Sequence, residues 1–254
     1  MTARFLLSAS TLLLLSCSSF AQIVNVEGSR LDESKQGWQG LADLSFYAVK
    51  NTNTLYQLNN KLRLQYVASR HRWLMLNDIN LSVSNELKFE QNAFQHLRYG
   101  LMLDSAYVLE CFGQHQYDRI QLIKRRVLLG GGLRIRFLER GLIHSYYGFT
   151  YMLEYEDELV TLNRNLLSRL STYVNIKLTI KEWLKFLSTS YYQPRLSYFG
   201  DFRLSTNNTL EFKINGNLSI LTKYVLIFDS SPVDDPSVPK INMKLTNGFS
   251  YKFK

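Results

Sequence analysis

The chain has 254 residues, of which 46% are hydrophobic, and its 30 Lys and Arg against 21 Asp and Glu give a formal net charge of +9. After residue 21 no apolar run approaches the roughly 18 residues of a membrane-spanning helix, which argues against a helical inner-membrane protein. A basic chain can bind nucleic acid or the phosphates of lipopolysaccharide. The sequence patterns at the N-terminus and at the C-terminus of this chain favour lipopolysaccharide.

Residues 1–21 have the features of a secretory signal peptide. Arg4 supplies the positive charge, residues 5–15 the apolar core, and Ser19–Ala21 a small-x-small cleavage site. Leu14–Cys17 also resembles a lipobox, which would leave Cys17 lipidated instead. Cleavage after Ala21 removes one positive charge and no negative one. It leaves Cys111 as the only cysteine, so we expect no intramolecular disulfide.

Residues 22–37 are polar and show no periodicity, and we predict a periplasmic N-terminal tail there. Residues 38–254 alternate between apolar and polar side chains, which is typical of β-strands with two different faces. They form one predicted domain, an all-β, transmembrane, antiparallel up-and-down β-barrel of about 12 strands. The predicted strands are 38–49, 55–68, 72–84, 94–103, 106–117, 122–137, 143–156, 166–179, 184–195, 201–213, 217–229 and 241–253.

The connections between these strands fit an even-numbered barrel. Asp104-Ser105 divides one long apolar run into the fourth and fifth strands. With twelve strands both termini lie on the periplasmic side, and 69–71, 104–105, 138–142, 180–183 and 214–216 become short periplasmic turns. Residues 85–93, 157–165 and 230–240 become longer outer loops. Proline, which cannot donate to a ladder, is absent before Pro194.

Individual strands separate the two faces. In 201–213 the apolar side chains are Phe202, Leu204, Leu210 and Phe212, and the polar ones are Arg203, Ser205, Asn207, Thr209, Glu211 and Lys213. In 122–137 the apolar side chains are Ile123, Val127, Leu129, Leu133, Ile135 and Phe137, and they oppose Lys124, Arg126, Arg134 and Arg136. A soluble lipocalin-like barrel would turn the apolar face inward, and eight strands make a barrel that side chains can fill. Twelve long strands and the C-terminal pattern argue against this alternative.

The predicted lumen carries charges of both signs. Glu110 and Gln114 lie on the inner face of one strand, and Arg126, Arg134 and Arg136 lie on that of the next. We predict an interior ion-pair ladder of these five residues that sets the strand register and fills the lumen. The alternative is that they form the constriction of a small anion-preferring pore or the base of a small-solute site.

The sequence offers no convincing catalytic or metal site. His144 and Ser145 are neighbours on a strand and point to opposite faces, so they cannot form a dyad. His96 shares a face with Arg98 and fits a polar network. No Cys/His or carboxylate cluster has metal-ligand spacing, and Gly130–Gly132 lacks the following helix of a phosphate loop. We therefore expect no enzyme activity, metal or cofactor, and a lipid-acting hydrolase is the weakest alternative.

The C-terminus carries an assembly signal. Residues 246–253 fit a polar-x-Gly-x-x-aromatic-x-aromatic pattern through Gly248, Tyr251 and Phe253. This pattern resembles the closing strand that the β-barrel assembly machinery of the outer membrane reads.

Two adjacent segments resemble a known family. Residues 110–118 read ECFGQHQYD and residues 126–134 read RVLLGGGLR. They resemble the Glu-x-Phe-x-Gln-x-x-Tyr-Asp and Arg-x-Leu-x-Gly-x-Gly-x-Arg core of predicted outer-membrane β-barrels of unknown function, also described as salt-induced outer membrane proteins. Residues 58–60, 76–78, 95–99 and 191–194 are similar too, while Cys111 and Gly131 occupy variable positions. The resemblance implies a fold and an outer-membrane location but no reaction, ligand or catalytic residue.

We therefore expect a monomeric outer-membrane barrel of a Gram-negative bacterium with a structural or envelope-adaptive role. Its expected partners are outer-membrane lipid, lipopolysaccharide and the assembly machinery, and not nucleic acid.

Overall fold

The structure is a computed structural model that describes residues 25–50, 54–84, 87–161 and 163–251. One short 3-10 helix, η1 (Glu27–Ser29), precedes twelve strands. These are β1 (Gly37–Lys50), β2 (Thr54–Ala68), β3 (His71–Ser84), β4 (Leu87–Met102), β5 (Tyr107–Asp118), β6 (Ile123–Arg140), β7 (Ile143–Glu158), β8 (Arg164–Lys181), β9 (Leu184–Arg195), β10 (Tyr198–Lys213), β11 (Leu218–Asp229) and β12 (Ile241–Tyr251).

The strands form one antiparallel sheet in sequence order, from β1 to β12. The all-β, up-and-down architecture with twelve strands is confirmed. The division of β4 from β5 is also confirmed, because Asp104 Oδ1 accepts hydrogen bonds from the amides of Ala106 and Tyr107 and closes a tight turn. No helix in the described part of the chain is long and apolar enough to cross a membrane.

Several strands extend further than predicted. β4 begins at Leu87, so most of the predicted outer loop 85–93 is strand. The polar run at residues 90–92 suggested a loop, but polar side chains also occur on the inner face of a strand in such a sheet. β7 and β8 likewise leave only residues 159–163 between them, where 157–165 was predicted as a loop. The loop between β11 and β12 has the predicted bounds, 230–240.

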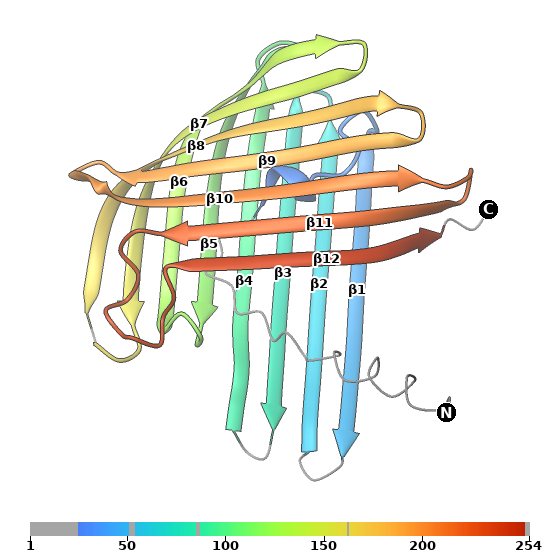
Figure 1. Ribbon diagram of the computed structural model, residues 1–254. Coiled ribbons are helices and arrows are strands. Elements are labelled where there is room, and N and C mark those ends of the chain that lie inside the picture. Colours follow the sequence, from blue (N-terminus) through green and yellow to red (C-terminus); the bar gives the residue numbers. More distant parts are fainter. Residues whose placement is uncertain (1–24, 51–53, 85–86, 162, 252–254) are drawn as a thin grey trace, which may run out of the picture.

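The sheet curls around the N-terminal segment (Figure 1). Figure 1 shows β1–β4 and β8–β12 running at a steep angle to each other, with η1 between them. Contacts from the segment to Gln65 of β2 and Tyr191 of β9 show that distant strands face the same interior. Among the described residues no ladder joins β1 to β12, and β1 is exposed along most of its length on both faces.

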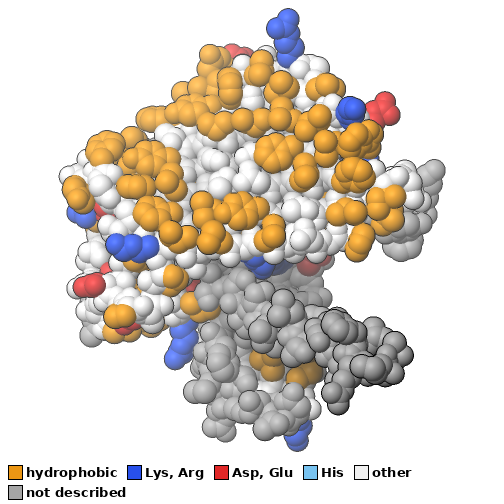
Figure 2. All heavy atoms as spheres, in the orientation of Figure 1, with side chains coloured by type: hydrophobic (Ala, Val, Ile, Leu, Met, Phe, Trp, Pro, Cys, Tyr) orange, Lys and Arg blue, Asp and Glu red, His pale blue; other side chains and the backbone are white. Residues whose placement is uncertain are grey.

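Apolar side chains cover the outer face of the sheet. Leu129 is 60% exposed and Phe149 44%, and Figure 2 shows apolar side chains spread over the visible surface with few charged ones among them. A soluble fold would bury such residues, whereas the opposite face here holds buried arginines and carboxylates. The sheet therefore has its polar face inside, as predicted.

The inner face departs from the prediction in two ways. Ile123 is buried and Lys124 is exposed, the reverse of the predicted assignment, because a β-bulge between Ile123 and Arg125 shifts the alternation. The interior also contains apolar clusters. One comprises Val26, Leu74, Leu76 and Phe94, and the other Phe112, Leu128 and Met152.

Candidate functional site

The candidate site is the interior of the sheet where residues 25–36, here called the inner segment, meet the strands. The sequence predicted a tail over 22–37, and the described part of it instead packs against the inner face. Val26 is 4% exposed and packs in one cluster with Leu74, Leu76 and Phe94. Nothing in the sequence indicated this packing, because the segment has only one short apolar patch.

Six charged side chains, here called the plug network, bind the inner segment to the strands. Arg134 donates to Glu27 at 2.7 and 2.9 Å and to Glu33 at 3.0 Å. Arg30 donates to Glu27 at 2.7 Å, to Glu33 at 3.1 Å and to Glu110 at 2.5 Å. Arg98 completes the network through Glu110 at 2.7 Å. Three arginines therefore balance three carboxylates.

Uncharged groups hold the inner segment as well. Tyr173 donates its hydroxyl to Glu27 at 3.0 Å, and the backbone amide of Glu27 donates to the hydroxyl of Tyr191 at 3.2 Å. The amide of Leu31 donates to the side chain of Gln65 at 3.0 Å. The segment thus contacts strands on both sides of the interior, and the buried carboxylate and amide of Glu27 both have partners.

The charge of Glu27 depends on this surrounding. Burial alone would raise the pKa of this carboxyl, but Arg30 and Arg134 outweigh it and lower the pKa from 4.5 to about 2. Glu27 is therefore ionised at neutral pH and depends on its two arginines.

A second buried network, here called the Glu154 network, crosses the interior between β6 and β11. Glu154 is fully buried and accepts two hydrogen bonds from Arg203, at 2.7 and 2.9 Å. Arg169 lies 3.4 Å from Glu154 and 2.8 Å from Asp201. The other pairs join Arg203 to Asp229 at 2.9 Å and Arg126 to Glu156 at 2.5 Å.

The five predicted site residues lie on the inner face but do not form one ladder. Glu110 pairs with Arg30 and Arg98. Arg134 belongs to the plug network, whereas Arg126 belongs to the Glu154 network. Arg136 pairs with Glu139 near the end of β6. The register of β5 and β6 explains why the five residues do not form a ladder, because Glu110 lies opposite Gly132 and not opposite an arginine. The partners of Glu110 come from β4 and the inner segment.

Gln114 belongs to a polar contact that reaches the plug network through Arg98. It pairs with His96 at 2.9 Å, and the imidazole lies between the rings of Phe94 and Phe112, with centroid distances of 5.9 and 5.3 Å. Arg98 donates to the other ring nitrogen at 3.2 Å. His96 is thus held in a polar network, as the sequence suggested.

A glycine makes room for one of the groups that hold the inner segment. A Cβ atom at Gly148 would collide with the ring of Tyr173, whose hydroxyl binds Glu27. Gly148 lies opposite Tyr173 in the register of β7 and β8. The ring therefore reaches Glu27 only because position 148 lacks a side chain.

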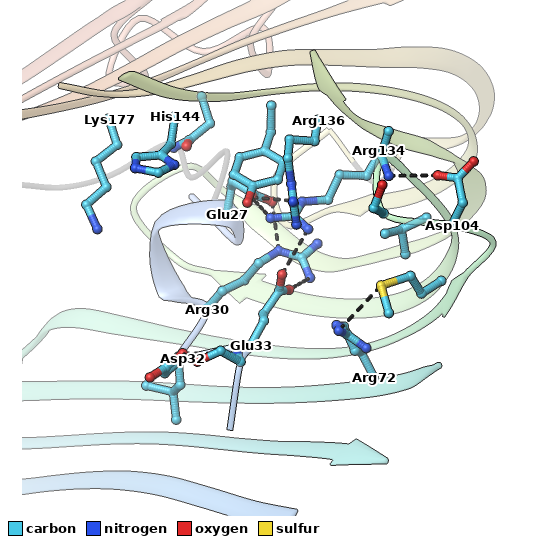
Figure 3. Close-up of a pocket in the computed structure, with 18 of the residues that line it drawn as sticks. Glu27, Arg30, Asp32, Glu33, Arg72, Asp104, Arg134, Arg136, His144 and Lys177 are labelled. Carbon is cyan, nitrogen blue, oxygen red and sulfur yellow. Dashed lines mark hydrogen bonds and ion pairs between the residues drawn. The ribbon is translucent and has the colours of Figure 1, made fainter. Parts of the chain in front are cut away.

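A large open cavity lies beside the inner segment, at the short-turn end of the strands, and is here called the vestibule. Its volume is about 1080 Å³. Figure 3 shows Arg72 on one side of it, His144 and Lys177 on the other, and the inner segment between them. Arg70, Asp104 and Arg136 also line it.

The remaining predicted features lie elsewhere. Gly248 is in β12 opposite Leu221, and Tyr251 ends that strand, whereas Phe253 lies outside the described residues. In the described ranges no group of three or more His, Cys, Asp or Glu is arranged to hold a metal ion. The assembly signal stays a prediction.

Sequence reasoning missed Glu27, Arg30 and Glu33. These three residues alternate in charge at three-residue spacing. That spacing was a weak signal of a turn that presents one charged side. Their partners could not be inferred, since Glu27 and Arg134 are separated by 107 residues.

The chain matches one family model and is similar to several solved structures. The model, described as a protein of unknown function, DUF481, matches residues 42–253. No curated protein matches. The NanC porin structure is 8% identical with a TM-score of 0.48, and the alignment covers 84% of this chain and 100% of that chain.

Two further solved structures are less similar. The β domain of the Bordetella autotransporter BrkA is 13% identical with a TM-score of 0.34, over 85% of this chain and 98% of that one. OmpT, an outer membrane protein of Vibrio cholerae, is 10% identical with a TM-score of 0.30, over 84% and 95%.

Proposed function

The chain belongs to the DUF481 family of proteins of unknown function, and we propose that it is an outer-membrane β-barrel whose lumen is closed by its own N-terminal segment. The role we propose is structural or envelope-adaptive, without enzyme activity or a cofactor. The single observation that carries this proposal is the plug network, in which Arg30 and Arg134 tie the inner segment to the strands.

The geometry supports a lumen that does not conduct. The inner segment is bound from β2, β5, β6, β8 and β9 and lies across the interior. Beyond it the Glu154 network joins arginines of β6, β8 and β10. Buried ion pairs of this kind resist opening, because separating them leaves charges without partners in a place of low dielectric constant.

The outer surface supports the proposed location. Exposed leucine and aromatic side chains cover the outer face, and the chain contains 16 Tyr and 15 Phe, which suit the interfacial girdles of a barrel. The signal peptide pattern and the C-terminal pattern of Gly248, Tyr251 and Phe253 agree. Outer-membrane lipid, lipopolysaccharide and the assembly machinery are the proposed partners of a monomer.

The test is single-channel conductance of the mature chain, residues 22–254, in planar lipid bilayers. We expect the native protein to give no stable channel steps. Arg134→Gln removes the hydrogen bonds from β6 to Glu27 and Glu33 and should give frequent openings, whereas Arg136→Gln on the same strand should stay closed. Steady conductance of the native protein would overturn the proposal.

A small anion-preferring pore is the second candidate, and one observation favours it. The vestibule contains Arg70, Arg72 and Lys177, none of which forms an ion pair in the described part of the chain. A reversal potential measured for Arg134→Gln in a KCl gradient tests this candidate. Selectivity for chloride would support it, and selectivity for potassium would contradict it.

A further inference from the structure

The vestibule has more cationic groups than its own carboxylates neutralise. Six arginine and lysine side chains line it, Arg30, Arg70, Arg72, Arg134, Arg136 and Lys177, against the acidic Glu27, Asp32, Glu33 and Asp104. Glu27 and Glu33 are already bound by Arg30 and Arg134. The plug network is therefore balanced, Arg136 pairs with Glu139, and Arg70, Arg72 and Lys177 form no ion pair among the described residues.

Of the two remaining carboxylates, only Asp32 interacts electrostatically with one of these cations, Lys177, and it lies too far away to form an ion pair. Asp104 accepts hydrogen bonds from the amides of its own turn at 2.7 and 2.8 Å. Asp32 accepts from Ser34 and lies 3.9 Å from Lys35. Both carboxylates thus have local partners, and neither forms an ion pair with Arg70, Arg72 or Lys177 within the described ranges.

Arg72 has only weak partners in the vestibule. Arg72 donates to the carbonyl oxygen of Ser69 at 3.4 Å and to the sulfur of Met102 at 3.6 Å, and a thioether is a weak acceptor. The Nε atom of Arg136 is buried and has no hydrogen-bond partner, although another nitrogen of this side chain binds Glu139. Arg72 therefore keeps donors available for an incoming anion, whereas Arg136 already binds a carboxylate.

The free cations come from opposite sides of the cavity. Arg70 follows β2, Arg72 is in β3, and Lys177 is near the end of β8. Figure 3 shows Arg72 and Lys177 on different sides, with Arg136 between them. A cavity of about 1080 Å³ slightly exceeds the range for small-molecule sites, which is roughly 300–1,000 Å³, and is large enough for a ligand with several charged groups. An excess of one sign of charge in such a cleft concentrates counter-ions.

We propose that the vestibule is a binding site for a multivalent anion, whose phosphate or carboxylate groups engage Arg72 on one side and Lys177 on the other. A single small anion would reach one side of the cavity, whereas a ligand with several anionic groups spans it. This inference goes beyond the closed lumen, because binding in the vestibule requires no conduction.

Isothermal titration calorimetry of the mature chain in zwitterionic detergent tests the site at low salt. Inorganic tripolyphosphate and citrate are the two anionic probes, and sucrose is the neutral one. We expect saturable binding of one anion per chain and no binding of sucrose. Binding of tripolyphosphate alone identifies a phosphate site, and binding of both anions identifies a site for either group.

Matched variants locate the binding. Arg72→Gln and Lys177→Gln should each weaken binding about 10-fold or more, as expected when a charge-assisted hydrogen bond is lost. Lys124 is half-exposed, pairs with Asp157 and lies near the other end of the strands, so Lys124→Gln should change affinity less than about twofold. Lys177 is exposed and Arg72 is half-buried with weak partners only, so their variants should keep the native unfolding midpoint.

Two results would overturn the proposal. One is the absence of saturable binding of both anions to a protein that unfolds like the native one. The other is an equal loss of affinity in Lys124→Gln and in the vestibule variants, which would indicate a response to net charge alone. Neither result bears on conductance, so failure here is distinguishable from failure of the closed lumen.

Discussion

At the residue scale, Arg134 is the strand residue that holds the inner segment most extensively. It donates to two carboxylates of the segment, Glu27 and Glu33, and its guanidinium lies 3.9 Å from the centre of the Tyr146 ring. Arg136, two positions away on the same strand, binds the exposed Glu139 instead. The two arginines share a strand and a face but differ in burial.

This contrast gives a matched pair of substitutions. Arg134→Gln leaves Glu27 and Glu33 with Arg30 as their remaining arginine and should lower the free energy of unfolding by about 3–5 kcal/mol, as for other broken buried pairs. Arg136→Gln should cost less than about 1 kcal/mol, as for exposed pairs. Urea unfolding of both variants in lipid vesicles is the measurement, and equal effects would contradict the assignment.

The pKa of Glu27 predicts how acid affects the inner segment. Because the bound state favours the ionised carboxylate, its contribution is complete above about pH 4.5 and is lost as the pH falls towards 2. A nitroxide on Ser34→Cys, in a Cys111→Ser background, should therefore become more mobile over this range. In Glu27→Gln the label should already be mobile at pH 7, and a pH-independent spectrum of the parent would contradict the prediction.

At the element scale, β7 and β8 are shaped to hold the segment. Gly148 of β7 has no side chain, and the ring of Tyr173 from β8 occupies the space where a Cβ atom would lie. Both strands also contribute to the Glu154 network through Glu154 and Arg169. These two strands therefore position the plug and the second network together.

A methyl group at position 148 tests this arrangement. Gly148→Ala should displace Tyr173, remove its hydrogen bond to Glu27 and cost about 1–3 kcal/mol, the usual penalty for overpacking. At Gly113 an added Cβ would meet Leu129 at an ordinary 3.5 Å, so Gly113→Ala is the matched control. Urea unfolding of the two variants decides, and an effect of Gly113→Ala as large as that of Gly148→Ala would argue against the steric explanation.

At the scale of the whole molecule, the fold is a curled sheet with charge inside and apolar groups outside. In a membrane the outer face requires apolar side chains, whereas in water an exposed leucine tolerates replacement by arginine. Leu129 lies on the outer face in the middle of β6, and Leu142 lies in the turn before β7. Their exposed fractions are similar, at 60% and 57%.

These two leucines distinguish a membrane barrel from a soluble one. Leu129→Arg should lower the free energy of unfolding in lipid vesicles by about 2–4 kcal/mol, and Leu142→Arg by about 0–1 kcal/mol, following the depth dependence of charges on the lipid face. Urea titration in vesicles gives both values. Two equally small effects would exclude a buried position in lipid for Leu129.

Much of this architecture followed from local pattern. Strict alternation predicted the number, order and faces of the strands, and the Asp104 turn was visible because turn residues interrupt an apolar run. The bulge that reverses Ile123 and Lys124 was not, since it depends on pairing with β7. The site was only partly predictable. Alternation placed Glu110 and Arg134 inside, but their partners Arg30 and Glu27 come from a segment without periodicity.

Hydrogen exchange shows most directly whether the inner segment is bound inside the sheet and closes the lumen. The amides of residues 27–31 each donate a hydrogen bond, two of them to Tyr191 and Gln65 of the strands. Mass spectrometry of the native mature chain should therefore show slow deuterium uptake over residues 25–31, well below that of an unstructured peptide of the same sequence, and faster uptake there in Arg134→Gln. Uptake in the native protein as fast as in an unstructured peptide would show that the segment is not bound inside the sheet, and the closed lumen would have to be abandoned.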